Sequence, residues 1–250
     1  MALLHRAVGA VSRRLDRPEL LAAIDPVARQ AGNDAIAINA VLAGTLREGS
    51  VYVDVGTNRG QVLGEAVRIA PHAHHIAFEP IPSLAEIVRT RFPSVDCRRL
   101  ALAGKPEVTE FCYFRKLDGW SGLRRSPEIT DERGAPEFIE VTVSTLDAEL
   151  SGLTPSVIKI DVEGAELAVL EGGSSLLQAT RPTLILEHVP QAGELYGASS
   201  EDLWDLLDGL AYTVYAITGE GPFSRAAFAA ERTVVNWLAV PVAGACSQLS

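Results

Sequence analysis

The sequence is poor in cysteine and in aromatic residues, and both shortages exclude classes of protein. Its 250 residues include three cysteines, one methionine and 6% aromatic residues. The cysteines Cys97, Cys112 and Cys246 are odd in number and form no Cys-x-x-Cys pair. This pattern disfavours a disulfide framework and a cysteine metal site, so we expect thiols that are buried or without a role.

Long apolar runs are also missing. No segment approaches the roughly 20 apolar residues that are needed to cross a bilayer. Residues 1–6 lack the basic stretch followed by an apolar run that marks a secretory signal. We therefore expect a cytoplasmic protein that has no membrane partner.

Basic residues are outnumbered by acidic ones, 22 lysines and arginines against 32 aspartates and glutamates. The net charge is -10 and the pI is near 5.0, whereas nucleic-acid-binding domains usually carry a basic stripe. The arginines form only isolated doublets, such as Arg98-Arg99 and Arg124-Arg125. A nucleic-acid partner is therefore disfavoured, although the distribution of charge matters more than its total.

The length and a hydrophobic content of 47% predict one large α/β domain with a substantial core. Residues 1–49 have apolar residues at helical spacing, and we expect Pro18 and Pro26 to break them into short helices. From residue 50 onward strands and helices alternate, which predicts a parallel sheet joined by right-handed crossovers. Strands are expected at 51–55, 75–79, 95–100, 156–160, 183–188, 212–217 and 233–240, and helices at 60–70, 83–92, 163–178 and 200–210. Two extra strands, at 107–114 and 138–143, flank a polar stretch at 117–136 that we expect to be functional or disordered.

The most informative segment is 51–60, where an apolar strand leads into an acidic residue, a glycine loop and a helix. The next strand ends in Glu79, at the spacing of one βαβ unit. In open α/β sheets this layout surrounds the crevice at the strand ends, where nucleosides bind. Glu79 offers two acceptor oxygens to the two hydroxyls of a ribose. The helix N-terminus offers unpaired N–H groups to an anionic group of the same ligand.

The glycine spacing distinguishes between nucleoside ligands. Counted from Gly56, the dinucleotide fingerprint requires glycine where this chain has Asn58 and Gln61, which argues against NAD or FAD. A Walker loop is also absent from the sequence. The remaining form, Asp54-x-Gly56-x-x-x-Gly60, is typical of S-adenosylmethionine-dependent methyltransferases. A tight turn in another kind of α/β protein remains the alternative.

A second strand-to-helix junction, at 157–166, carries three carboxylates. Asp161 falls where the strand ends and faces the expected crevice. Glu163 and Glu166 are three residues apart, so we expect them to share a helix face. The helix macrodipole favours acids there by about 0.3–1 kcal/mol each, which accounts for Glu163 or Glu166 but explains Asp161 less well.

A further strand ends in Glu187 and His188. His188 is a candidate general base, a candidate hydrogen-bond partner of a substrate, or a polar residue at a strand end. Asp161, Glu187 and His188 also form a sparse candidate for a metal site, and we expect no metal.

Several segments together resemble the FkbM family of S-adenosylmethionine-dependent methyltransferases. They are 53–60, 77–80, 145–147, 158–166 continuing into 169–173, 182–187 and 236–239. The most distinctive is the Lys-Ile-Asp-Val-Glu-Gly run at 159–164. The resemblance spans about residues 50–241 and predicts an N-terminal helical extension (1–49), a methyltransferase domain (50–241) and a C-terminal tail (242–250). Arg59 departs from the family pattern, which has an apolar or small residue there, and it either contacts the cofactor carboxylate or points to solvent.

The resemblance implies a Rossmann-like sheet of seven strands in which the last strand is antiparallel. It implies S-adenosylmethionine as cofactor, S-adenosylhomocysteine as its product, and O-methylation of a hydroxyl on a small molecule such as a sugar or a polyketide. The residues implied to bind the cofactor are Asp54, Gly56, Thr57, Asn58, Gly60, Glu79, Ala101 and Asp161. Ser121 falls in a stretch that the resemblance places beside the substrate.

A hydroxyl acceptor requires a base that takes its proton. We expect Asp161, His188 or Glu163 to be catalytic, and Glu166 and Glu187 to contact the substrate. Three alternatives stay open: a catalytically silent scaffold that binds S-adenosylmethionine, an NAD-linked oxidoreductase on a similar sheet, and an RNA methyltransferase. The sequence contains no signal for an oligomeric state.

Overall fold

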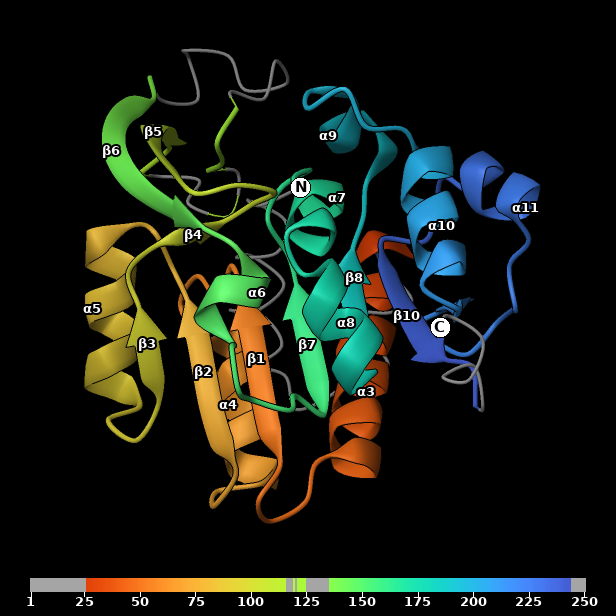
Figure 1. Cartoon of the computed structure of the whole chain (residues 1–250), viewed down its shortest axis with the longest axis horizontal. Helices are drawn as coiled ribbons and strands as arrows, with labels where there is room; N and C mark the ends of the chain where they lie inside the picture. The colour runs from red at the N-terminus through yellow and green to blue at the C-terminus, as the bar shows by residue number, and fades with distance from the viewer. Residues whose placement is uncertain (1–25, 116–118, 120, 125–134, 244–250) are drawn as a thin grey trace.

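A computed structural model of the chain describes residues 26–115, 119, 121–124 and 135–243. Its centre is a seven-stranded sheet in the order β3-β2-β1-β7-β8-β10-β9, with helices on both sides (Figure 1). The strands of this sheet are β1 (Val51–Val55), β2 (His74–Phe78), β3 (Asp96–Arg98), β7 (Val157–Ile160), β8 (Thr183–Glu187), β9 (Tyr212–Ala216) and β10 (Asn236–Pro241). The strands predicted from the sequence are therefore confirmed, with shifts of one to three residues at their ends.

The strand order changes direction between β1 and β7. The chain runs outward from β1 through β2 to β3, and it later continues from β7 to β8 on the other side of β1. These neighbours are parallel, whereas β10 is antiparallel to both β8 and β9. The predicted Rossmann-like sheet with an antiparallel last strand is confirmed, and its switch point is the position at which open α/β sheets bind ligands.

The central strands are buried on both faces, as expected for parallel strands that are covered by helices. Alternate residues of β1 point to opposite sides. Val53 and Val55 pack in a cluster with Leu170 and Leu177, while Tyr52 packs in a separate cluster on the other face.

Helices from different parts of the chain cover the two faces. The face that includes Tyr52 is covered by α3 (Pro26–Thr45), α4 (Gln61–Ile69) and α5 (Pro82–Arg91). The opposite face is covered by α6 (Leu146–Glu149), α7 (Glu166–Glu171), α8 (Ser174–Thr180), α10 (Ser200–Gly209) and α11 (Arg225–Ala230). A short helix, α9 (Pro190–Glu194), follows β8. None of the described helices combines the length and the apolar character needed to cross a membrane.

A second, three-stranded sheet lies beyond the carboxyl ends of β1 and β2 (Figure 1). It consists of β4 (Ala101–Leu102), β6 (Glu137–Ser144) and β5 (Glu107–Tyr113), in that order. Its inner face, with Phe111 and Val141, packs on Ile81 and Leu84. The two extra strands predicted from the sequence are thus confirmed. Most of the polar stretch at 117–136 lies outside the described residues.

The helix boundary predicted at Pro26 is confirmed, since α3 begins there, but at 20 residues this helix is longer than the short helices expected. Pro18 lies outside the described residues. Proline fits the first turn because its missing N–H would have no partner inside the helix. The single helix expected at 163–178 is instead α7 and α8, since the chain at Gly172 approaches the backbone of Ala103. A Cβ atom on Gly172 would lie 2.3 Å from the Ala103 carbonyl oxygen.

The expectation for the cysteines is confirmed for two of the three. Cys97 and Cys112 are both buried. Cys246 lies outside the described residues.

The short elements β4, α6, α9 and α11 had not been predicted.

The loops that follow β1 and β7 approach each other most closely at Gly56. This residue has a left-handed φ of 77°, and a Cβ atom on it would lie 1.8 Å from the carbonyl oxygen of Asp161. Only glycine fits there without a shift of the backbone.

Replacing Gly56 by alanine is expected to destabilise the fold more than the same change at Gly49. Both residues have left-handed φ angles, 77° and 79°, at which an L-residue is strained by about 1–2 kcal/mol. The methyl group at position 56 must also displace the Asp161 carbonyl, which adds about 1–3 kcal/mol. At Gly49 no atom lies within 4 Å of the new Cβ. Urea unfolding of the two variants measures the difference, and equal losses would contradict the close approach.

Candidate functional site

A cavity of about 650 Å³ lies outside the carboxyl ends of β1, β2 and β7. The loops that follow these strands form its wall, together with β4, Phe111, Gly119, Ser121 and Leu123. A second cavity of about 300 Å³ is lined by Asp54, Thr57 and Lys159. Asp161 lines both cavities and therefore lies at their junction.

Glu79 connects the loops that follow β1 and β2. Its carboxylate is only 3% exposed and accepts hydrogen bonds from the N–H groups of Asn58 and Ile81, both at 2.9 Å. A carboxylate has about four lone-pair sites. Because Glu79 lines the larger cavity, it can also accept hydrogen bonds from a ligand.

The glycine loop is fixed by its neighbours. The N–H groups of Gly56 and Thr57 both donate to the carbonyl oxygen of Phe78, at 3.0 and 3.1 Å. Gly60 caps α4 with a φ of 72°, and a Cβ atom there would lie 2.7 Å from the ring of Phe92. Of the predicted cofactor residues of this loop, Gly56 and Asn58 line the larger cavity, Asp54 and Thr57 line the smaller one, and Gly60 lines neither.

A buried lysine joins the two predicted aspartates. Lys159 lies opposite Asp54 in the register of β7 and β1. Its ammonium donates to Oδ2 of Asp161 at 2.9 Å and lies 3.8 Å from Oδ1 of Asp54. Thr57 donates its hydroxyl to the other oxygen of Asp54, at 3.2 Å. The network ties the end of β1 to the end of β7.

Burial and charge oppose each other in this network. Burial raises the pKa of Asp54, against the opposing effect of Lys159. For Lys159, burial acts to lower the pKa, but the carboxylates of Asp161 and Asp54 outweigh it and the pKa is raised. The ammonium thus remains charged in the interior.

Three further carboxyl groups surround Asp161, and each has a raised pKa. Burial, followed by repulsion from Asp161 and Glu187, raises the pKa of Glu163 well above its ordinary value. Repulsion from Asp161, followed by burial, raises the pKa of Glu187 to about 8. Burial raises the pKa of Glu166 to about 7. Perturbed acids beside a cavity are typical of functional sites.

Glu163 and Glu166 do not share a helix face as predicted, because the helix begins only at Glu166. Glu163 lines the cavity in a loop with a φ of 57°. Glu166 is 2% exposed, and its Oε1 atom accepts hydrogen bonds from the N–H groups of Val162 and Gly164, at 3.2 and 3.0 Å. Glu166 therefore braces the loop that carries Glu163, and it is not part of the cavity wall.

His188 lies apart from the cavity. Its Nε2 atom is 2.9 Å from the hydroxyl of Ser200, and its ring stacks on Phe228 with the centroids 5.6 Å apart. Burial lowers its pKa to about 4, so the ring is neutral. Adjacent residues of a strand face opposite sides, and this separates His188 from Glu187. The geometry gives no support to His188 as general base.

Within the described ranges, no three or more His, Cys, Asp or Glu side chains are grouped so that they could hold a metal ion. The candidate set of Asp161, Glu187 and His188 is therefore not brought together as a metal site.

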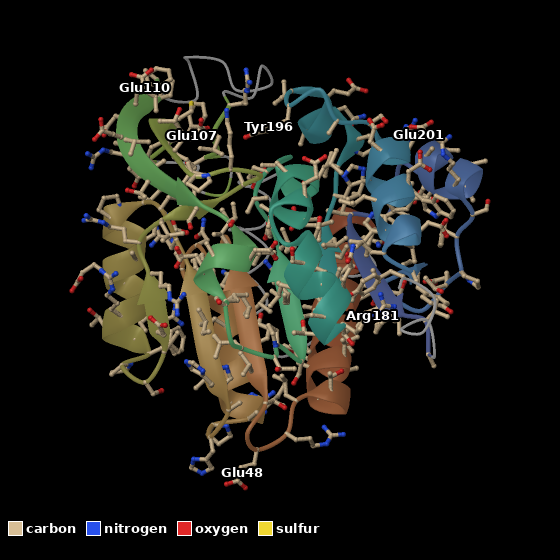
Figure 2. All side chains as sticks on the ribbon, in the orientation of Figure 1. Glu48, Glu107, Glu110, Arg181, Tyr196 and Glu201 are labelled. Atoms are coloured by element: carbon tan, nitrogen blue, oxygen red, sulfur yellow. The ribbon has the colours of Figure 1, made fainter. Side chains whose placement is uncertain are left out.

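The far side of the cavity is closed by residues 121–124. Ser121 and Ala101 line the cavity, and the hydroxyl of Ser121 accepts a hydrogen bond from the N–H of Phe114 at 3.0 Å. Tyr196, which lies between the small sheet and α9 (Figure 2), accepts a hydrogen bond from the N–H of Arg124 at 3.0 Å. A Cβ atom on Gly122 would lie 3.1 Å from the Tyr196 hydroxyl and 3.6 Å from Cβ of Glu163.

Two residues of the site were not predicted as such. Lys159 carried a signal, since it is a lone charge in an apolar strand. Tyr196 carried none, because its place depends on how the α9 segment packs on residues 121–124.

The sequence matches one known family. A model described as "Methyltransferase FkbM domain" matches residues 54–214, which include both strand-to-helix junctions of the cavity. A comparison with curated protein sequences found no match.

Similar solved structures include three methyltransferases. A methyltransferase FkbM from Methylobacillus flagellatus KT has 16% identity and a TM-score of 0.48 over 79% of this chain and 45% of that one. The plantazolicin methyltransferase BpumL, in complex with a monoazolic desmethylPZN analog and SAH, has 11% identity and a TM-score of 0.47 over 94% of both chains. A TehB-like SAM-dependent methyltransferase from Corynebacterium glutamicum ATCC 13032 Kitasato has 12% identity and a TM-score of 0.43 over 89% of this chain and 96% of that one. This chain spans less than half of the first of these relatives, and at such low similarity nothing about its substrate follows from them.

The raised pKa values predict that stability falls as the pH rises. Glu187 has a pKa of about 8 in the folded protein against an ordinary value of 4.5. Between these values the unfolded chain has lost the proton that the folded protein keeps, so the free energy of unfolding decreases with pH. Glu187→Gln has no carboxyl group at this position, so this decrease in the free energy of unfolding is absent. The difference in Tm, variant minus unchanged protein, should therefore increase from about pH 5 to about pH 8.

Thermal unfolding followed by circular dichroism at several pH values measures this difference. Glu194→Gln, which alters an exposed residue at the end of α9, is the matched control and should show no such trend. A Tm difference for Glu187→Gln that does not vary with pH would contradict the buried cluster.

Proposed function

Since the chain belongs to the FkbM methyltransferase family, we propose that it methylates a hydroxyl group on a small organic molecule. The methyl donor of the family is S-adenosylmethionine, which supplies a methyl group activated by a positively charged sulfur. The residues around the cavity determine how donor and acceptor are held and where the acceptor proton goes.

The cavity has groups that fit each part of this cofactor. Glu79 presents acceptor oxygens that suit the two hydroxyls of a ribose. Apolar surface for an adenine ring comes from Leu100, Ala101 and Leu102. The smaller cavity, which contains Asp54 and the glycine loop, suits the amino-acid end. We assign Asp161, at the junction of the two cavities, to the cationic groups of the cofactor.

The position of Glu163 is the observation that carries the proposal for the acceptor. Glu163 and Asp161 both line the cavity, and a Cβ atom on Gly122 would lie 3.6 Å from Cβ of Glu163. A base works best when its pKa is near the working pH, and the pKa of Glu163 is raised. We assign Glu163 as the base that takes the proton of the hydroxyl.

Glu187 lines neither cavity and is not assigned to the acceptor, although its pKa near 8 keeps its proton in place at neutral pH. Ser121, in contrast, lines the larger cavity and is assigned to the acceptor. Ser121 accepts from the N–H of Phe114 and therefore has its own O–H available as a donor. Glu166 is assigned to support the loop rather than to contact the acceptor.

A small acceptor is favoured over a nucleic acid by charge. The acidic groups around Asp161 would repel a phosphate backbone, which binds through lysine and arginine.

We also retain as a proposal the division into an N-terminal extension (1–49), a methyltransferase domain (50–241) and a C-terminal tail (242–250).

Replacing Glu79 by glutamine is expected to weaken the binding of S-adenosylhomocysteine. Hydrogen bonds to a charged acceptor contribute about 1.5–3 kcal/mol, which corresponds to a loss of about tenfold or more in affinity. Isothermal titration calorimetry measures the Kd. Glu86→Gln, at an exposed position of α5, makes the same chemical change away from the cavity and should leave the Kd unchanged. An unaltered Kd in Glu79→Gln would exclude the ribose contact.

Replacing Glu163 by glutamine is expected to lower the rate of methyl transfer by about 10²–10⁴-fold, the usual contribution of a general base. The rate of the unchanged protein should rise with pH as Glu163 loses its proton, and this rise should disappear in the variant. Release of S-adenosylhomocysteine with a panel of sugar and polyketide alcohols measures turnover.

The control for this experiment is Glu171→Gln, at an exposed position of α7, which should retain the full rate. Full turnover in Glu163→Gln would refute its role as base. Tight binding of the cofactor without turnover of any alcohol, amine or thiol would instead support a catalytically silent scaffold.

A further inference from the structure

Lys159 is the one described lysine that lies in the interior, with a side chain only 6% exposed. It interrupts a strand whose other residues, Val157, Ile158 and Ile160, are apolar and fully buried. The strand geometry explains its contacts. Asp54 is its register partner on β1, and Asp161 lies two residues further along and thus on the same side.

The two partners of Lys159 differ in their access to the cavities. The side chain of Asp54 is 1% exposed, whereas that of Asp161 is 26% exposed. The ammonium itself is shielded from water, and its shorter contact, 2.9 Å against 3.8 Å, is with Asp161. Its charge therefore acts most strongly on the carboxylate that a ligand can reach.

We propose that Lys159 is a positioning residue, whose ammonium holds the Asp161 carboxylate in place for the cofactor at the junction of the two cavities. This inference rests on the proposed role of Asp161 in holding the cationic part of the cofactor. Lys159 itself does not line the larger cavity, so it acts through Asp161.

The surrounding charges explain why such a residue is needed. Five carboxyl groups face this region: Asp54 from β1, Asp161, Glu163 and Glu166 from the segment after β7, and Glu187 from β8. Lys159 is the cation that opposes them in these interactions. Without it, the neighbouring carboxylates repel one another, and Asp161 loses the donor that holds it at the cavity junction.

A purely structural role predicts a different result. An apolar side chain that fills the same volume can replace a buried ion pair with little loss of stability when no charge is left unpaired. Removing a structural lysine would lower cofactor affinity to the same extent with and without the carboxylate of residue 161. Removing a lysine that positions Asp161 should lower affinity in the unchanged protein but have little further effect in Asp161→Asn.

The experiment measures the Kd of S-adenosylhomocysteine by calorimetric titration for the unchanged protein, Lys159→Met, Asp161→Asn and the double variant. Lys159→Met should weaken binding about tenfold, the usual effect of losing a hydrogen bond between charged groups. The double variant should bind as Asp161→Asn does. Lys159→Arg keeps the positive charge and should restore most of the affinity.

Lys105→Met is the matched control, since the side chain of Lys105 is 79% exposed, and it should not change the Kd. If Lys159→Met does not fold, Asp54→Asn/Lys159→Met is compared with Asp54→Asn, because the double variant leaves Asp161 as the one carboxylate that has lost this ammonium. The same loss of affinity is expected for this pair.

An equal loss of affinity with and without the Asp161 carboxylate, or an unchanged Kd in Lys159→Met, overturns the inference while the proposed function stands. Failure of the unchanged protein to bind S-adenosylhomocysteine overturns both.

Discussion

The backbones that follow β1 and β7 meet at Gly56 with no room for a side chain between them. This close approach joins the two halves of the sheet at the point where the strand order reverses, and it brings the loops after both strands to one crevice. Glu79 adds the loop after β2 through its bonds to Asn58 and Ile81. The cavity therefore exists because three strand ends are held together by backbone contacts, before any ligand contributes.

Charge is distributed unevenly across this crevice. At the end of β2, Glu79 has backbone N–H groups as partners, whereas the segment after β7 concentrates acids around the single cation Lys159. Burial and mutual repulsion raise the pKa of Glu163 and Glu187. These carboxyl groups destabilise the folded protein at neutral and higher pH. A cost of this kind is common where a site has to change its protonation state during a reaction.

The sheet and its switch point could be predicted because each central strand is a continuous apolar run that ends in glycine or an acidic residue. The predictions made from the sequence failed where contacts between distant segments decide the structure. Gly172 ends a helix because Ala103 lies against it, and the strand periodicity turns His188 away from the side that Glu187 faces. Lys159 was visible as an isolated charge, but its partners depend on the register of β7 with β1. The place of Tyr196 depends on the packing of a loop, which no local pattern encodes.

The small sheet leaves and rejoins the rest of the chain at neighbouring points. Ala101 is the register partner of Val143, and the N–H of Ala103 donates to the carbonyl oxygen of Ser144 at 3.0 Å. The chain between residues 104 and 143 is thus an insertion whose two ends are joined by backbone pairing. Such an insertion can be exchanged without altering the order of the main strands. Since it contributes Phe111, Ser121 and Leu123 to the cavity, evolution or grafting can reshape this wall of the cavity while the loops after β1, β2 and β7 stay intact.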